Sequence, residues 1–188
     1  MSGTAKIHDA ELKPSKLELL AGWLPNQPWF DGDAGDLRRV AAFRFVDPDG
    51  EVGIETLLVA SGDRLYQVPL TYRPEPLDDE LAVLVGTIEH SDLGTRYCYD
   101  ATSDPVYVAE LIRVIHEADN EAELSRGEKS MTVRGSGIVP VSNASMEAAR
   151  LVRVLDGDHV RTAQPLGTLT GTWTQDGVER TEILATLR

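Results

Sequence analysis

The chain has 188 residues, a formal net charge of −13 and an apolar fraction of 41%, which fits one folded domain. A chain this acidic repels phosphate backbones and anionic membrane surfaces, which argues against nucleic-acid binding and membrane association. The single cysteine, Cys98, excludes an internal disulfide, and the first residues carry no apolar signal-peptide segment, so we expect a cytoplasmic protein.

The N-terminal part predicts a short helix, a loop and three strands. Residues 9–20 favour the helix, and residues 22–36 form a loop that contains glycines, prolines and aromatic residues. Three strands joined by turn sequences follow, over residues 37–46, 51–60 and 65–73. Pro69 cannot donate a hydrogen bond to a neighbouring strand, so we expect the third strand to lie at an edge or to contain a bulge.

The middle of the chain predicts two strands and the main helix. Residues 81–89 have the apolar content of a buried strand, and residues 94–99 form a short strand after a turn. The strongest helical pattern covers residues 104–118, because Asp104 is a favoured N-cap residue and Pro105 suits the first helical position. Its apolar residues share one face, so we expect this helix to pack on the sheet.

The C-terminal part returns to strands after a polar linker over residues 121–130. Four strands are predicted, over residues 131–141, 148–155, 166–174 and 178–187. Gly135-Ser136-Gly137 in the first of them indicates a bulge, and Asp176-Gly177 predicts a hairpin turn between the last two. The predicted fold class is α+β, with a curved, mainly antiparallel sheet, barrel-like in one alternative, packed on one main helix plus a short N-terminal helix.

The sequence contains no recognisable set of catalytic residues. It has no glycine-rich nucleotide loop, no hydrolase nucleophile motif and no close metal-ligand spacing, so we expect no cofactor and no metal. His90 is the best acid–base candidate because Glu89 and Asp92 flank it; the alternative is a turn histidine bonded to backbone. Cys98 is expected to be a buried structural cysteine, and the chain is expected not to be an enzyme.

Three sequence segments, taken together, resemble one family. They are residues 22–30 (GWLPNQPWF), 65–73 (LYQVPLTYR) and 86–107 (GTIEHSDLGTRYCYDATSDPVY). In this order they resemble the N-terminal cap domain of actinobacterial maltokinases and its stand-alone relatives, over about residues 15–115. The resemblance implies a cystatin-like sheet with a helix. We therefore expect a cap-like region over residues 1–120, and a β extension over residues 131–188 that continues the same sheet.

The resemblance also implies a function. In maltokinases the cap precedes a kinase that makes maltose 1-phosphate from maltose and ATP, on the route from trehalose to glycogen. The segment after residue 120 is too short for two kinase lobes and shows no catalytic-loop pattern. The resemblance thus implies a non-catalytic partner or regulator of a kinase or another enzyme of trehalose, maltose or glycogen metabolism. The expected contact surface is His90, Arg96, Tyr97 and Asp100, which in the alternative interpretation only fix the corner between strand and helix.

Two further hypotheses remain open from the sequence. In the first, the protein binds a sugar or an apolar small molecule in a concavity of the sheet lined by aromatic side chains. The candidates are Trp23, Trp29, Tyr66, Tyr72 and Trp173, which would otherwise fill the core. In the second, the chain is an enzyme with an unrecognised site near His90.

Overall fold

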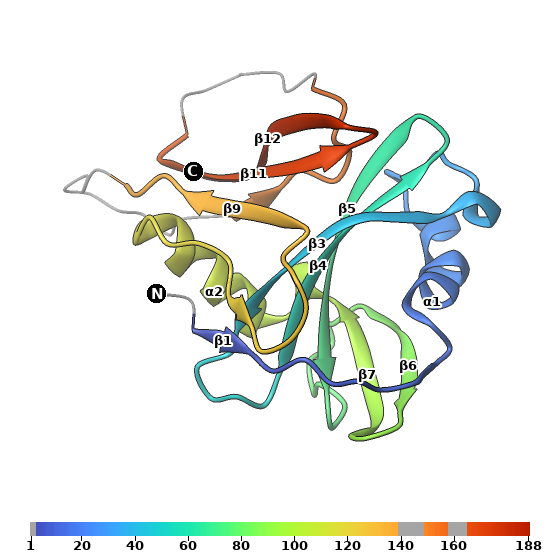
Figure 1. Ribbon diagram of the computed structural model, residues 1–188. Coiled ribbons are helices and arrows are strands. Elements are labelled where there is room, and N and C mark those ends of the chain that lie inside the picture. Colours follow the sequence, from blue (N-terminus) through green and yellow to red (C-terminus); the bar gives the residue numbers. More distant parts are fainter. Residues whose placement is uncertain (1–2, 139–148, 158–164) are drawn as a thin grey trace.

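The computed structural model describes residues 3–138, 149–157 and 165–188 (Figure 1). Within these residues, mostly antiparallel strands form a curled half-barrel sheet and a second sheet, accompanied by two α-helices, so the α+β class is confirmed. Parts of two predicted strands, residues 139–141 and residue 148, lie outside the described residues. Neither helix approaches the roughly 20 apolar residues that a membrane-spanning helix requires.

The half-barrel contains six strands, and the three consecutive ones over residues 38–73 match the predicted strands closely. The strand order is β2 (Leu12–Lys13), β6 (Leu84–His90), β7 (Gly94–Asp100), β5 (Arg64–Arg73), β4 (Gly53–Ser61) and β3 (Arg38–Val46). The turn between β3 and β4 is closed by Asp47, whose carboxylate accepts hydrogen bonds from the amides of Asp49, Glu51 and Val52. The β3–β4–β5 meander is thereby confirmed as predicted.

β5 is not an edge strand, which corrects the expectation drawn from Pro69. It pairs with β4 over its length and with β7 from Leu70 onward. The Gln67 amide points away from β4 and donates to the Arg153 carbonyl. Backbone nitrogens two residues apart in a strand face the same side, so the nitrogen of Pro69 also points away from β4. Pro69 therefore sits at the gap between the β7 ladder and the Arg153 segment, where no donor is required.

β6 differs from the prediction in both length and burial. It begins at Leu84 rather than residue 81, and Leu84 is 49% exposed. Along β6 only Ile88 is fully buried. The partner of β6 on its outer side is the two-residue strand β2, so most of this strand lies near the open end of the sheet.

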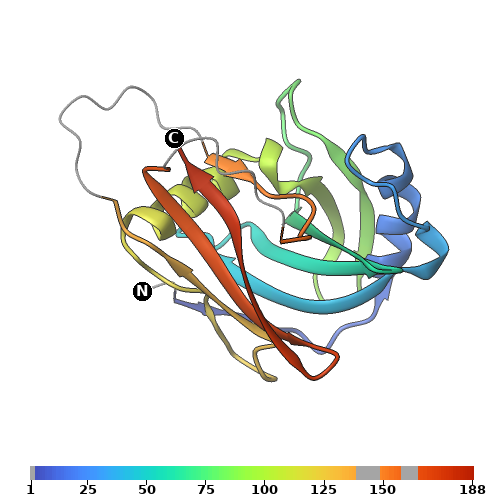
Figure 2. The same cartoon turned by 90° about the horizontal axis from the view of Figure 1, so that it is seen from above.

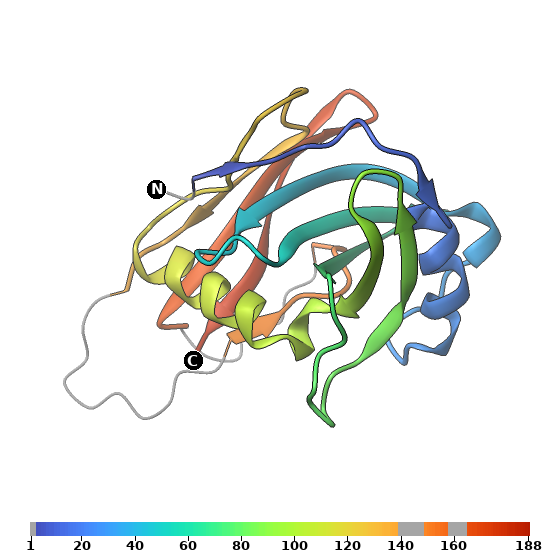
Figure 3. The same cartoon turned by 90° about the horizontal axis from the view of Figure 1, so that it is seen from below.

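The two helices lie on opposite faces of the half-barrel and toward opposite ends of the molecule (Figures 1 and 3). α1 (Lys16–Trp23) begins at a capping box in which Ser15 and Glu18 bond each other's backbone amides. α2 (Pro105–His116) begins as predicted, with the Asp104 carboxylate accepting from the Val106 amide at 3.0 Å. The same buried carboxylate holds Arg73 of β5 through two bonds, which ties the helix to the sheet.

The C-terminal strands form a separate sheet, so the prediction of one continuous sheet is wrong. β10 (Ala149–Leu151), β12 (Val178–Leu187), β11 (Gly167–Gln175) and β9 (Met131–Gly135) pair in that order. The new sheet faces the half-barrel across a shared core that also contains α2 (Figure 2). Two backbone hydrogen bonds, Gln67 to Arg153 and Leu155 to Leu65, connect the segment that follows β10 with β5. The hairpin turn at residues 176–177 is confirmed.

The segment over residues 121–130 is packed rather than a free linker. β8 (Glu123–Leu124) pairs in parallel with β1 (Thr4–Ala5), and the Ala122 amide donates to the Arg44 carbonyl at 2.8 Å. The Ser130 hydroxyl bonds both backbone groups of Ala42 in β3. The polar composition suggested a linker. The hydrogen bonds that hold the segment join it to residues far away in the sequence, and no local pattern reveals them.

Candidate functional site

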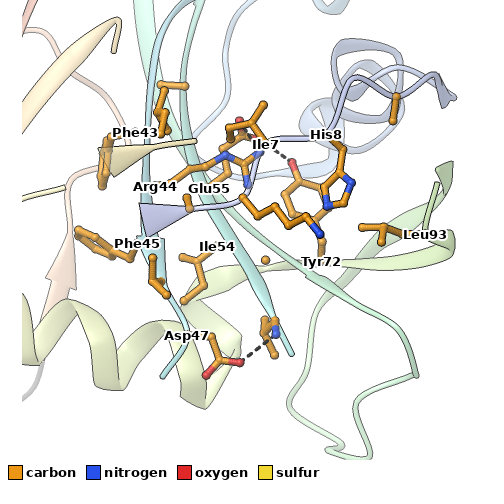
Figure 4. A pocket seen from close by; sticks show the side chains of 18 of the residues that line it. Ile7, His8, Phe43, Arg44, Phe45, Asp47, Ile54, Glu55, Tyr72 and Leu93 are labelled. Carbon is orange, nitrogen blue, oxygen red and sulfur yellow. Dashed lines mark hydrogen bonds and ion pairs between the residues drawn. The ribbon is translucent and has the colours of Figure 1, made fainter. Parts of the chain in front are cut away.

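A cavity of about 740 Å³ lies between the N-terminal segment and the face of the half-barrel that carries α1 (Figure 4). We call residues 4–12 the N-terminal strap, since they cross this face from β3 to β6 (Figure 3). The volume falls within the range of about 300–1,000 Å³ typical of small-molecule sites. Among the described residues, no group of three or more His, Cys, Asp or Glu side chains is arranged to hold a metal ion.

Hydrogen bonds at both ends hold the strap in place. At one end β1 pairs with β8, and at the other β2 pairs with β6. Beside β2, the Glu11 amide donates to the Ser91 hydroxyl at 3.1 Å, and the Ser91 amide donates to the Glu11 carbonyl at 3.0 Å. The cavity beneath the strap is therefore preformed.

A buried charge cluster forms the floor of the cavity. Glu55 of β4 bonds Lys16 at the start of α1, accepts from the Tyr72 hydroxyl at 3.0 Å and pairs with Arg44 at 3.1 Å (Figure 4). Burial opposes ionisation of Glu55, but the two cations and the Tyr72 hydroxyl outweigh it and lower its pKa to about 2. Burial lowers the pKa of Lys16 from its ordinary value, against the opposing effect of Glu55.

The lining of the cavity is cationic although the chain is acidic. Lys and Arg outnumber Asp and Glu by six to four in the lining, against 18 to 31 in the whole chain. Arg39 and Arg96 add to the two cations that share Glu55. One of the acidic residues, Asp47, is already engaged by three backbone amides of its own turn. The local charge therefore favours an anion.

His90, the acid–base candidate from the sequence, lies at the edge of this cavity. Its Nδ1 accepts hydrogen bonds from the amides of Asp92 and Leu93, both at 3.2 Å. Burial, followed by the neighbouring His8, lowers the pKa of the His90 imidazole. The His8 ring lies 5.4 Å away, edge to face, and its Nδ1 is 3.3 Å from the Asp92 carboxylate. His90 therefore makes the hydrogen bonds expected in the alternative interpretation, in which it is a turn histidine bonded to backbone.

The structure separates the four residues of the expected contact surface. His90 and Arg96 both line the cavity, whereas Tyr97 points to the opposite face of β7. Asp100 is 7% exposed, and its carboxylate caps the amide of Thr102 and bonds Arg153 at 2.5 Å. Asp100 thus fixes the strand-to-helix corner, as the alternative interpretation has it.

The five aromatic candidates do not surround one concavity. Trp23 at the end of α1 packs on Trp29, with ring centres 5.9 Å apart, and Trp29 packs on Tyr66 of β5 at 6.2 Å. Trp173 lies in the core between the two sheets. Of the five, Tyr72 lines the cavity under the strap. Aromatic character alone could not separate these environments, because a ring fills a core as readily as it lines a pocket.

Cys98 is a buried structural cysteine, as predicted. Its side chain is fully buried on β7, and burial raises the pKa of the thiol to about 12. At neutral pH the sulfur therefore keeps its proton, and it lacks the thiolate character of a nucleophile.

Glu55, Lys16 and Arg153 are residues that the sequence analysis missed. A usable signal existed for Glu55, the one carboxylate inside the apolar strand sequence GIETLLVA, since a buried charge requires a partner. Lys16 and Arg153 gave no such signal. The partners of Arg153 are Asp100 and the Trp29 ring, 4.7 Å from its guanidinium, both distant in sequence.

Comparison with known proteins agrees with the resemblance seen in the sequence. A search of curated proteins finds no match. A family model does match, that of the maltokinase N-terminal cap domain, over residues 23–104. The matched range contains β3 to β7 and ends at the Asp104 N-cap of α2. Residues 23–104 of this chain are therefore similar to the maltokinase N-terminal cap domain.

Proposed function

We propose that the protein is a cap module that docks onto a maltokinase-type kinase domain and regulates its phosphorylation of maltose. The family match supports this role, because the domain is named for its place at the N-terminus of such kinases. A connection with trehalose and glycogen metabolism follows from the same proposal.

An exposed apolar patch within the cap domain carries the proposal. Leu81 is 82% exposed, and Val83 and Leu84 are more than one-third exposed, all within four consecutive residues. The backbone beneath them is fixed, since the Val83 amide donates to the Ser103 hydroxyl and the Val83 carbonyl accepts from the Asp100 amide, both at 2.9 Å. A rigid apolar patch on an acidic surface is typical of a protein–protein contact.

The test combines the purified chain with a separately purified maltokinase kinase domain that lacks its own cap. We expect a complex by size-exclusion chromatography and calorimetry, and a changed rate of maltose phosphorylation. The double variant Leu81→Lys/Leu84→Lys should lose both effects, because lysines at the centre of an apolar contact remain unpaired.

Val178→Lys is the matched control. Val178 is 60% exposed in β12, on the second sheet and outside the family match, so its substitution should leave complex formation unchanged. Absence of a complex with the unaltered chain, or equal binding by the double variant, would contradict the proposal.

A further inference from the structure

We propose that the cavity under the N-terminal strap binds a small organic anion, a carboxylate or a phosphate ester. This site is distinct from the apolar patch at residues 81–84, because none of those residues lines the cavity. Of the five aromatic residues expected to line a concavity, Tyr72 alone lines this cavity, so its lining is not the aromatic one expected from the sequence.

Charge balance is the first argument. Lys16 and Arg44 share one carboxylate, that of Glu55, so this cluster carries one positive charge more than it neutralises. Arg39 and Arg96 increase the excess. Cations that are partly removed from water lose hydration, and an anion bound between them restores the lost interaction.

An unsatisfied donor is the second argument. Arg96 bonds the Leu93 carbonyl through one terminal nitrogen at 2.6 Å, but its Nε is buried and has no hydrogen-bond partner among the described residues. Leaving a buried charged donor unmatched is costly, so such groups usually meet an acceptor. Because Arg96 lines the cavity, a rotation of its guanidinium that exposes Nε would let an oxygen of the ligand supply that acceptor.

The size and the remaining lining identify the ligand as organic. An inorganic anion would occupy a small part of about 740 Å³. Ile7 of the strap and Leu93 of the turn after β6 also line the cavity (Figure 4), as does Ile88 of β6, and they offer apolar surface to a carbon skeleton. A ligand with an acidic head and a carbon body satisfies both parts of the lining.

The experiment measures binding to the full chain by calorimetry with four probes. Octanoate represents an alkyl carboxylate, glucose 1-phosphate represents a phosphate ester, and octanol and inorganic phosphate are the neutral and the inorganic comparisons. We expect one of the two organic anions to bind at a 1:1 ratio with a Kd below about 1 mM, and to shift the His8 and His90 ring resonances. Which of the two binds decides between a carboxylate and a phosphate ester.

Variants then locate the site. Arg96→Gln should weaken binding about tenfold or more, because a charge-assisted hydrogen bond is lost. Arg39→Gln is a second test that leaves the Glu55 cluster intact. Arg38→Gln is the matched control, since Arg38 is the neighbouring residue and lies outside the lining. Circular dichroism verifies that each variant is folded.

Several results would overturn the proposal: no organic anion binds below that concentration, inorganic phosphate or octanol binds equally well, or both arginine variants bind as the unaltered chain does. The kinase domain is absent from this experiment, so its outcome is independent of the docking proposal.

Discussion

At the scale of single residues, Glu55 shows how a charge inside the sheet determines its surroundings. The carboxylate is almost completely buried on β4, yet it is held ionised by Lys16, Arg44 and the Tyr72 hydroxyl. Removing one member of such a cluster leaves the others buried and unbalanced. The turn sequences on either side predicted β4, but no local pattern could identify a partner 39 positions away.

Glu55→Gln should lower the free energy of unfolding by about 3–5 kcal/mol at neutral pH, because two cations lose their counter-charge. Chemical denaturation followed by circular dichroism measures this. Glu89→Gln is the control, since Glu89 is an exposed residue of β6, and its change should stay within about 0.5 kcal/mol. Equal losses in the two variants would show that the cluster does not stabilise the fold.

The same carboxylate predicts a dependence of stability on pH. The pKa of Glu55 is about 2 in the folded protein, below its ordinary value of 4.5. Between these values the unfolded chain binds the proton more readily, so the contribution of Glu55 is complete above about pH 4.5 and is lost as the pH falls toward 2. The unaltered protein should therefore lose more stability than Glu55→Gln over this interval. Parallel curves from denaturation at a series of pH values would contradict this.

At the scale of elements, the packing of α2 on β9 explains why residue 135 is a glycine, which the sequence analysis interpreted as part of a bulge. β9 pairs with β11 in unbroken register from Met131 to Gly135, so no bulge occurs there. A Cβ atom at Gly135 would lie 2.0 Å from the Val114 carbonyl oxygen in the last turns of α2. The glycine is needed because helix and strand backbones approach closely, a contact between segments that local sequence does not encode.

Gly135→Ala should lower the free energy of unfolding by about 3 kcal/mol, because backbone atoms of the helix must move to accept the methyl group. Gly22→Ala is the matched control. Gly22 lies in α1 with no atom within 4 Å of an added Cβ, so this variant should be neutral or gain up to about 1 kcal/mol. A harmless Gly135→Ala would mean that α2 and β9 do not approach this closely.

At the scale of the whole molecule, the two sheets share one core. Phe43 and Ile54 of the half-barrel, Leu111 and Ile115 of α2, and Leu169 of the second sheet belong to the same buried cluster. The sequence predicted the strands of both sheets, because alternation and turns are local. It could not predict that they divide into two sheets, since that division depends on which strand edges meet.

The buried amide of Gln67 illustrates this limit. Its Nε2 donates to the carbonyls of Val152 at 2.7 Å and Leu184 at 2.9 Å, which joins β5 to β12 and to the residue after β10. A glutamine within a strand reads from sequence as a position facing solvent. Only the three-dimensional pairing shows that it is part of the connection between the sheets.

We therefore predict a single cooperative unfolding transition for the chain. Fluorescence distinguishes the two regions, since Trp23 at the end of α1 and Trp29 belong to one cluster and Trp173 lies between the sheets. In Trp173→Phe the signal reports on the α1 cluster, and in Trp23→Phe/Trp29→Phe it reports on the core between the sheets. The midpoints should coincide with that of the unaltered chain, after correction for each variant's own stability by circular dichroism. Two separate transitions would show that residues 131–188 unfold independently.

The contacts of Arg153 determine whether residues 23–104 can be transferred to another protein on their own. It lies outside the family match, yet it supplies the partner of Asp100 and covers the Trp29 ring, both inside the match. A chimera that contains residues 23–104 alone would have the Asp100 carboxylate without Arg153. The face of the half-barrel that packs on the second sheet would also be exposed to water. A functional transfer of this region therefore requires the C-terminal strands as well, or substitutions at Asp100 and its neighbours.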